Sequence, residues 1–252
     1  ERVYPANRNR RKDETEMICA KDDSALCCGR CDNPVIVMAT HDRIEITSKN
    51  IELLLPTKIV LIVSDMKELE YYKKYPISIV LHKNKPLGAK WQTGVNFSKR
   101  LNPNPLIILG SDDILHQTYT SLALELHKKG ADFVGLNSWF THDTKTGFTF
   151  KNRYINRNAG IPIGSGKSFS LNLLKRMNWK LFHTGLNKKL DDLSYLSAKN
   201  LKANIHIIQE PLILLVKGNW TMLHSTDDFL KSINISSEKV GNEILKEFRY
   251  DK

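Results

Sequence analysis

From residue 34 onward, short apolar runs alternate with longer segments that have one apolar side. Four of these runs are continuously apolar and rich in β-branched residues, which is typical of strands buried on both faces of a parallel sheet. A fifth run follows a helical pattern that ends at Gly130. We therefore predict strands at residues 35–39, 58–64, 77–81, 106–110 and 131–136.

The segments between these runs have helical patterns. After the fourth strand, apolar residues recur at steps of four, three and four, as on one face of a helix. Strands that alternate with helices indicate right-handed βαβ units. The predicted fold class is therefore α/β, with a Rossmann-like, open and mostly parallel twisted sheet flanked by helices. The predicted helices span residues 43–55, 66–75 and 89–101, followed by the one carrying Leu115, Tyr119, Leu122 and Leu126.

The rest of the chain is less regular. Residues 138–155 have hairpin character with "TKTG" as the turn, and residues 171–179 look helical. Residues 1–33 are polar and charge-rich, without sustained periodicity, so we interpret them as a lead-in. We expect one domain over residues 34–252, with halves that meet at residue 136.

The charge balance is strongly basic, with 38 Lys and Arg against 27 Asp and Glu in 252 residues. Residues 1–33 carry seven of each sign, so the excess lies in the predicted domain. Such a balance suits nucleic acid, a membrane surface or a phosphate-bearing substrate, and the alternative is a Lys-rich solvated surface. Since the chain shows no arginine-rich helix and no aromatic RNA-binding signature, we do not expect nucleic acid as the partner.

No apolar run approaches the ~18 residues that a membrane span needs, and the start does not resemble a signal peptide. We therefore expect no membrane-spanning segment and a location in the cytoplasm or a virion, and leave association with a membrane surface open. Because the first residue is Glu, we also expect that the chain is a segment of a longer one.

All four cysteines lie in the lead-in. Four thiolates could hold a structural zinc ion, but a zinc ribbon would need two C-x-x-C knuckles and only one is present. Zinc, local disulfides and free thiols all stay open, and no catalytic role is predicted. The cysteines are Cys19, Cys27, Cys28 and Cys31.

The stretch "AGIPIGSGKSFS" (159–170) looks at first like a phosphate-binding P-loop. That motif needs a glycine five places before Gly166, where Ile161 stands, and Pro162 lacks an N–H that the loop would use. The preceding residues are also polar and basic, whereas a P-loop follows a buried strand. A P-loop is therefore not predicted here.

Ligands of open α/β sheets bind outside the carboxyl ends of the strands, which directs attention to residues 40–43, Asp65, and residues 83–90 and 110–113. Asp112 and Asp113 follow the fourth strand directly. Adjacent carboxylates repel each other, so a hard divalent cation such as Mg²⁺ or Mn²⁺ would stabilise the pair. The alternative is that one of them caps a helix starting near Ile114.

Five motifs in this order resemble the GT-A glycosyltransferases, particularly their inverting, family-2-like branch. The resemblance extends from Pro34 to about Leu196. The motifs are "PVIVMATHDR", "LIVSD", "NKPLGAKWQTGVNFS", "ILGSDD", which is similar to the D-x-D signature, and "LDDLSYL" (190–196).

This resemblance implies a GT-A fold in which residues 34–136 bind a nucleotide-diphosphate sugar and residues 137–252 hold the acceptor. One aspartate would deprotonate the acceptor hydroxyl, and Mn²⁺ or Mg²⁺ would assist the leaving diphosphate. Gly110 departs from the commoner pattern, which has an aspartate there. The implied donor residues are Thr40, Arg43, Asp65, Gly88, Lys90, Asn96, Ser111 and Asp112; the metal ligands are Asp112, Asp113 and His224, with His206 as the second histidine; the catalytic residues are Asp192 and Asp191.

The acceptor side has weaker signals. Three residues of the "GSG" stretch would let the backbone pass close to a sugar, and tryptophans could stack on it, although most tryptophans simply pack. The "LDD" aspartates could instead cap a helix whose Leu193 and Leu196 lie in the core. The acceptor-side candidates are Gly164, Ser165, Gly166 and Trp139, with Trp179 and Trp220 as further stacking candidates.

The predicted function is therefore metal-dependent transfer of a sugar from a nucleotide-diphosphate sugar to a hydroxyl of a glycan, glycoprotein or other acceptor. Two alternatives stay open. One is a sugar-phosphate nucleotidyltransferase. The chain has no glycine-rich loop after the first predicted strand, which argues against this alternative. The other is a basic nucleic-acid-binding module without enzymatic activity.

Overall fold

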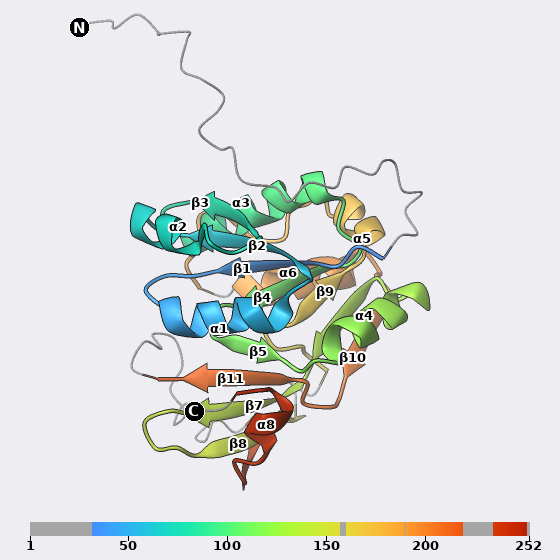
Figure 1. Cartoon of the computed structure of the whole chain (residues 1–252). Helices are drawn as coiled ribbons and strands as arrows, with labels where there is room; N and C mark the ends of the chain where they lie inside the picture. The colour runs from blue at the N-terminus through green and yellow to red at the C-terminus, as the bar shows by residue number, and fades with distance from the viewer. Residues whose placement is uncertain (1–31, 157–159, 189, 219–233, 251–252) are drawn as a thin grey trace, which may run out of the picture.

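The structure is a computed structural model that describes residues 32–156, 160–188, 190–218 and 234–250. These residues form a seven-stranded sheet of order β10-β6-β9-β4-β1-β2-β3 and a five-stranded sheet of order β12-β8-β7-β11-β5. Helices cover both faces of the larger sheet, and the smaller sheet lies below it (Figure 1). Cys19, Cys27, Cys28, Cys31, Trp220 and His224 lie outside the described residues.

The larger sheet is mostly parallel. Every strand runs in one direction except β9, which pairs antiparallel with β4 and β6. This mixed α/β architecture confirms the predicted fold class. Its strands are β1 (Val35–Ala39), β2 (Lys58–Val63), β3 (Ser78–Leu81), β4 (Leu106–Gly110), β6 (Phe133–Leu136), β9 (Lys167–Phe169) and β10 (Ile205–Ile208).

The helices divide between the two faces according to which core cluster they join. One face carries α1 (Ile44–Leu54), α2 (Met66–Tyr72) and α4 (Tyr119–Lys128). The other carries α3 (Leu87–Ser98), α5 (Leu171–Arg176) and α6 (Leu190–Asn200). A short 3₁₀ helix (Lys99–Leu101) extends α3, and α8 (Ile244–Glu247) lies near the end of the chain.

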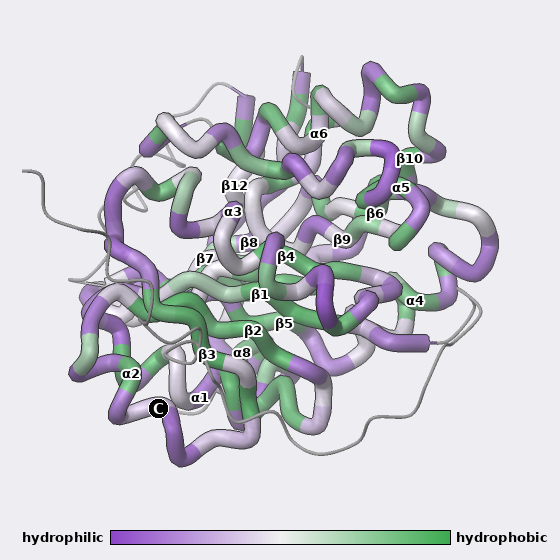
Figure 2. Tube along the Cα trace, turned by 90° about the horizontal axis from the view of Figure 1, so that it is seen from above, coloured by the Kyte–Doolittle hydropathy of each residue, from purple (hydrophilic) through white to green (hydrophobic). Residues whose placement is uncertain are grey.

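Strand periodicity separates the two core clusters. In β1, Ile36 and Met38 pack with α1 and α4, whereas Val35 and Val37 pack with α3 and α5. Successive side chains of a strand point to opposite faces, so a strand covered on both sides must be apolar at every position. This explains the continuous apolar runs, which appear as the green centre of Figure 2.

The smaller sheet draws on both predicted halves of the domain. One of its strands, at residues 113–115, precedes residue 136, and its other strands follow that residue. Conversely, β9 and β10 follow residue 136 and belong to the larger sheet. A third apolar cluster, with Ile46 of α1 and Phe248, covers this sheet. Its strands are β5 (Asp113–Leu115), β7 (Ser138–Asp143), β8 (Thr149–Tyr154), β11 (Ile213–Lys217) and β12 (Ile235–Val240).

The alternative in which Asp112 or Asp113 caps a helix near Ile114 is wrong, because the chain continues into β5, which pairs antiparallel with β11. Lys167 lies in β9, in agreement with the prediction that residues 159–170 form no P-loop. Ser170 caps α5, since its side chain accepts a hydrogen bond from the Leu173 N–H at the start of that helix.

Candidate functional site

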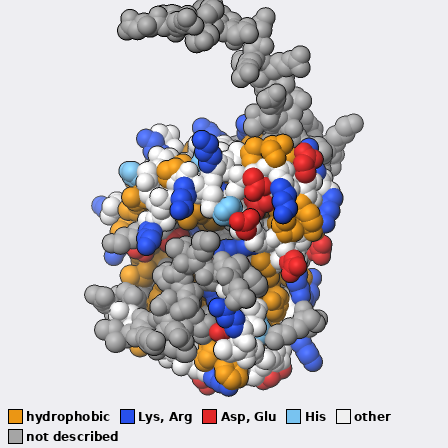
Figure 3. Space-filling model, turned by 90° about the vertical axis from the view of Figure 1, so that its left-hand side faces the viewer, with side chains coloured by type: hydrophobic (Ala, Val, Ile, Leu, Met, Phe, Trp, Pro, Cys, Tyr) orange, Lys and Arg blue, Asp and Glu red, His pale blue; other side chains and the backbone are white. Residues whose placement is uncertain are grey.

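The order of the larger sheet identifies where a ligand would bind. The chain builds β1, β2 and β3 in one direction and then returns to place β4 on the other side of β1. At such a switch point the flanking loops diverge and leave a crevice outside the carboxyl ends of the two strands. Both strands end on the left of Figure 1, which is the side that Figure 3 faces.

An ion pair bridges this switch point. Arg43, which follows β1, donates from Nη1 to Oδ1 of Asp112, which follows β4, at 2.8 Å. Lys217 at the end of β11 brings a second cation, with its Nζ 3.8 Å from Oδ2 of the same carboxylate. Asp112 is only 6% exposed, so both its oxygens face cations in a largely desolvated environment. This arrangement concentrates positive charge around one carboxylate.

Asp113, the second of the two adjacent aspartates, is also buried. Burial and the neighbouring Asp112 carboxylate raise the pKa of Asp113 to about 6, while Lys217, Ser165 and Arg43 oppose that rise. Its main-chain carbonyl accepts a hydrogen bond from Asn50 Nδ2 at 2.8 Å. A bound cation would favour the ionised form, because burial and like charge are what disfavour it.

Gly110 occupies the position where the GT-A pattern commonly has an aspartate. A Cβ built there would lie 2.9 Å from Cγ of Asp113, well inside van der Waals contact. The Asp113 carboxylate therefore fills the space that a side chain at position 110 would need. Beside it, Ser111 is 1% exposed and its hydroxyl has no hydrogen-bond partner among the described residues.

Lys90 and Thr40, two predicted donor-site residues, both have protein partners in this structure. Lys90 is buried, and its ammonium donates to the Thr40 carbonyl, to Ser64 Oγ at 2.6 Å and to Asn84 Oδ1 at 3.2 Å. An ammonium has three N–H donors, so these three oxygens use all of them. Thr40 points inward, with its hydroxyl 3.0 Å from that of Thr47.

Asp65 also has a structural partner, since it accepts the Glu68 N–H at 2.9 Å and caps α2. Glu68 is buried and accepts the N–H groups of Asp42 and Ser64 at 2.8 and 2.7 Å. His41, Asp42 and Glu68 are the one group of three possible metal ligands found among the described residues. Both carboxylate oxygens of Glu68 accept backbone N–H groups, so Glu68 braces the segments that follow β1 and β2.

The "GSGK" stretch connects the β4 end with the second acidic pair. Ser165 Oγ accepts the Gly110 N–H at 2.9 Å. One residue earlier, a Cβ at Gly164 would lie 2.5 Å from Cγ of Asp191, so the absence of a side chain lets that carboxylate pack against the loop. Consecutive residues of one loop therefore contact both acidic regions.

Gly166 has φ of +77°, a conformation in which a side chain is strained. Its N–H donates to the Ile108 carbonyl at 2.8 Å, and its carbonyl accepts from the buried Tyr119 hydroxyl. Gly166, which was predicted to lie on the acceptor side, is therefore required by a turn that joins the loop to β4.

Asp191 and Asp192 lie in the first turn of α6 and are exposed. The predicted alternative, in which Leu193 and Leu196 enter the core, was wrong: these side chains are 36% and 46% exposed. The buried residues of α6 are Leu190, Ser194 and Ala198. The helix therefore faces the core through a narrow stripe and presents its acidic first turn outward.

Several predicted site residues lie elsewhere. Trp139 is fully buried beside Tyr154, and Trp179 is 7% exposed, so neither offers a face for sugar stacking. Asn96 lies in the last turns of α3 and accepts a hydrogen bond from Gln92. Gly88 allows close approach of the His183 backbone. His206 is exposed on β10, which β6 and β9 separate from β4.

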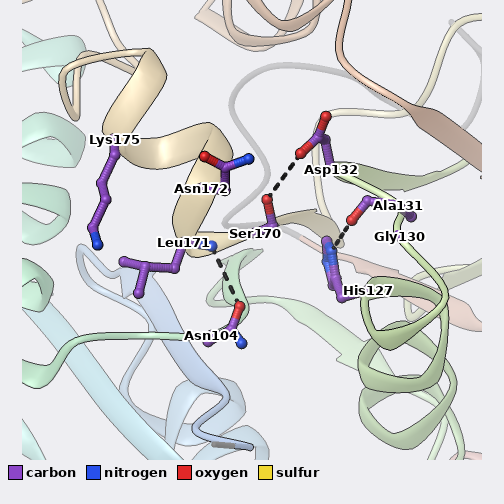
Figure 4. Close-up of a pocket in the computed structure, with 9 residues that line it drawn as sticks. All are labelled: Asn104, His127, Gly130, Ala131, Asp132, Ser170, Leu171, Asn172 and Lys175. Carbon is purple, nitrogen blue, oxygen red and sulfur yellow. Dashed lines mark hydrogen bonds between the residues drawn. The ribbon is translucent and has the colours of Figure 1, made fainter. Parts of the chain in front are cut away.

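Two cavities among the described residues lie away from this site. One, of about 430 Å³, opens at the amino ends of β4 and β6. There Ser170 points to Asp132, and His127 Nδ1 lies 2.7 Å from the Ala131 carbonyl (Figure 4). The other, of about 250 Å³, lies at the end of α1. Neither contains a predicted site residue.

The residues predicted for the site included neither Lys217 nor Lys167. The signal for Lys217 was the apolar run "LILLV" (212–216), which marks a buried strand and places the next residue at its carboxyl end. No comparable apolar run precedes Lys167, whose neighbours in the sequence are Gly166 and Ser168.

The comparisons with known proteins add a fold likeness only. The sequence matches no protein-family model and no curated protein. A solved structure that is similar is CMP:2-keto-3-deoxy-manno-octonic acid synthetase complexed with CTP, with 11% identity and a TM-score of 0.49 over 71% of this chain and 90% of that one. We therefore base the fold on the strand order and the site on its own contacts.

Within the described residues, none of the helices combines the length and the apolar character needed to cross a bilayer.

Proposed function

We propose that the chain is a glycosyltransferase of the GT-A type that uses a nucleotide-diphosphate sugar. The observation that carries this proposal is the loop at residues 164–166, which contacts both the Asp113 region at the switch point and Asp191 in the first turn of α6. Sugar transfer needs charge stabilisation on one side of the reacting carbon and a proton acceptor on the other. Two acidic pairs joined by one loop suit these two tasks.

The donor diphosphate would bind beside Arg43 and Lys217. Both cations face Asp112, and an arginine can hold phosphate oxygens in a bidentate manner. Mg²⁺ or Mn²⁺ would be held by Asp112 and Asp113, whose carboxylates are the oxygen ligands that hard cations prefer. When bound, the ion would neutralise charge on the departing diphosphate.

The acceptor hydroxyl would be deprotonated by Asp192. The hydroxyl oxygen forms a bond to the anomeric carbon, the bond from that carbon to the phosphate oxygen breaks, and the proton passes to the Asp192 carboxylate. The leaving diphosphate keeps the electron pair, and the anomeric configuration inverts. Both residues are exposed, and Asp192 is the better base because the Asp191 carboxylate packs against Gly164.

Nucleotidyl transfer from a nucleoside triphosphate to a sugar phosphate is the second candidate. Arg43 and Lys217 would suit a triphosphate as well as a diphosphate. The connection between β1 and α1 spans only residues 40–43, which leaves few free N–H groups to wrap a triphosphate. For this reason we place glycosyl transfer first.

A calorimetric panel of UDP, GDP and dTDP sugars and of CTP, each with Mn²⁺, tests the proposal. We expect one diphosphate sugar to bind and to be hydrolysed or transferred. Release of pyrophosphate from a triphosphate and a sugar phosphate would favour the second candidate. Binding of nucleic acid with steep salt dependence, without binding of any nucleotide, would instead support the non-enzymatic alternative.

A further inference from the structure

Lys167 is a buried lysine whose charge points at the first turn of α6. It is 2% exposed, and its ammonium donates to the main-chain carbonyl of Asp191. Side chains of a strand alternate, so Lys167 and Phe169 share the face on which α5 and α6 pack. Ser168 points to the other face, where its hydroxyl lies 2.7 Å from His127 Nε2.

A lysine is energetically unfavourable at this buried position, because its ammonium loses contact with water. Burying an ammonium costs free energy unless it is paired or fully hydrogen-bonded. In the described part of the chain, no carboxylate lies within ion-pair distance of Lys167. Burial accordingly lowers its pKa, and the nearby Asp191 and Asp192 oppose that shift. The favourable contact that the structure gives this charge is the Asp191 carbonyl.

The same carbonyl has a second side-chain donor. Ser194 Oγ lies 3.0 Å from it, one turn further along α6. The Asp191 carboxylate also packs against the backbone at Gly164. The first turn of α6 is therefore joined to the loop before β9 at Gly164 and to β9 itself at Lys167, only three residues apart.

We propose that Lys167 is a positioning residue that fixes the first turn of α6, and with it Asp191 and Asp192, relative to the carboxyl end of β4. The positioning itself depends only on the contacts of Lys167, whereas its effect on catalysis rests on the proposed function. An ammonium is a long, charged donor, so it reaches a carbonyl of the adjacent helix from a strand where an apolar side chain would only pack.

Hydrogen exchange measured by mass spectrometry tests the positioning without any substrate. In Lys167→Met, we expect peptides covering residues 190–197 to exchange about tenfold faster or more, the effect of losing one charge-assisted hydrogen bond. Peptides from β1 and β4 should keep their protection. Ser194→Ala should show a smaller change at the same place, and the exposed Lys175→Met on α5 should show none.

Two results would overturn the positioning role. Unchanged exchange in residues 190–197 of Lys167→Met would show that the carbonyl contact does not hold the turn. Faster exchange spread evenly over the larger sheet would show that Lys167 serves the core as a whole.

Kinetics with the donor identified by the nucleotide panel then tests the link to catalysis. Lys167→Met should lower kcat by about a hundredfold while KM for the donor stays within about twofold, because a misplaced base affects the chemical step and not donor binding. Arginine at this position keeps a cationic donor, so Lys167→Arg should recover part of kcat. If residues 190–197 of Lys167→Met exchange faster but kcat is normal, the acidic pair has no catalytic role. Lys167 would still be the residue that positions the turn. If the wild-type chain transfers no sugar, the proposed function fails, and the exchange result still decides the role of Lys167.

Discussion

The two acidic pairs of this protein have the same sequence and opposite environments. Asp112 and Asp113 are 6% and 7% exposed, between the ends of strands and beside two cations. Asp191 and Asp192 are exposed in the first turn of a helix. Desolvation and charged partners decide what a carboxylate can do, so the same dipeptide meets different conditions at the two places.

The fold around each pair creates this difference. Beyond β4 the chain enters β5, where Asp113 pairs with Leu215 of β11 and the Asp112 carbonyl accepts the Val216 N–H. In α6 only a narrow stripe of the helix faces the core, so the acidic turn stays in contact with solvent. Substitutions that exchange or remove single carboxylates test whether the two environments correspond to two roles.

The largest effect is expected from Asp192→Asn. Loss of the general base should reduce kcat for sugar transfer by about a thousandfold. Nucleotide binding measured by calorimetry should be unchanged. Asp191→Asn is the matched control and should lose less, because that carboxylate already packs against Gly164. If both variants retain full kcat, the exposed pair has no catalytic role.

Asp112→Asn should act on the donor instead. It removes a proposed metal ligand and the partner of Arg43, so Mn²⁺-supported binding of the nucleoside diphosphate should weaken by about a hundredfold. Glu70→Gln serves as the control, since this glutamate pairs with Lys73 on the surface at 2.7 Å. Equal loss of binding with and without Mn²⁺ would mean that Asp112 orients Arg43 and binds no metal.

Gly110→Asp restores the commoner GT-A pattern and should nevertheless destabilise the protein. The new side chain would meet the Asp113 carboxylate, which should lower the free energy of unfolding by about 2 kcal/mol. The double variant Gly110→Asp with Asp113→Ala should recover most of that stability in chemical denaturation. Full stability of the single variant would contradict the idea that Asp113 occupies the space at position 110.

The smallest effect concerns Lys90, whose pKa burial lowers to about 8 from 10.5. Between these values the unfolded chain binds more protons than the folded one, so stability rises with pH. The wild-type free energy of unfolding should gain about 1 kcal/mol between pH 8 and 9 relative to Lys90→Met. Parallel curves for the two proteins would indicate that Lys90 is not charged differently in the folded state.

The parallel core was predictable because its signal is local. The runs at residues 35–39 and 106–110 became β1 and β4 with their predicted bounds, since a strand buried on both faces must be apolar throughout. The short strands β5 and β9 were not predicted, because their signal is not local. β5 and β9 have three residues each, and they pair with strands far away in the sequence, which no local pattern reveals.

The site was predictable to the level of strand ends and not to the level of side chains. Asp112 and Arg43 were expected to share one site, and the structure brings them within 2.8 Å. Lys90 was expected at a phosphate and instead binds three protein oxygens. A strand end is set by sequence position, but whether a side chain turns to the crevice or to the core depends on partners contributed by distant segments.

The antiparallel β9 also has a consequence for the order in which the protein can assemble on the ribosome. β4 pairs on one side with β1 and on the other with β9, and Leu106 lies opposite Phe169. A nascent chain that has emerged only through β8 therefore presents one complete edge of β4 without its partner. Unpaired edges are templates for association with other chains, so a product truncated before residue 167 should aggregate rather than form a smaller stable sheet.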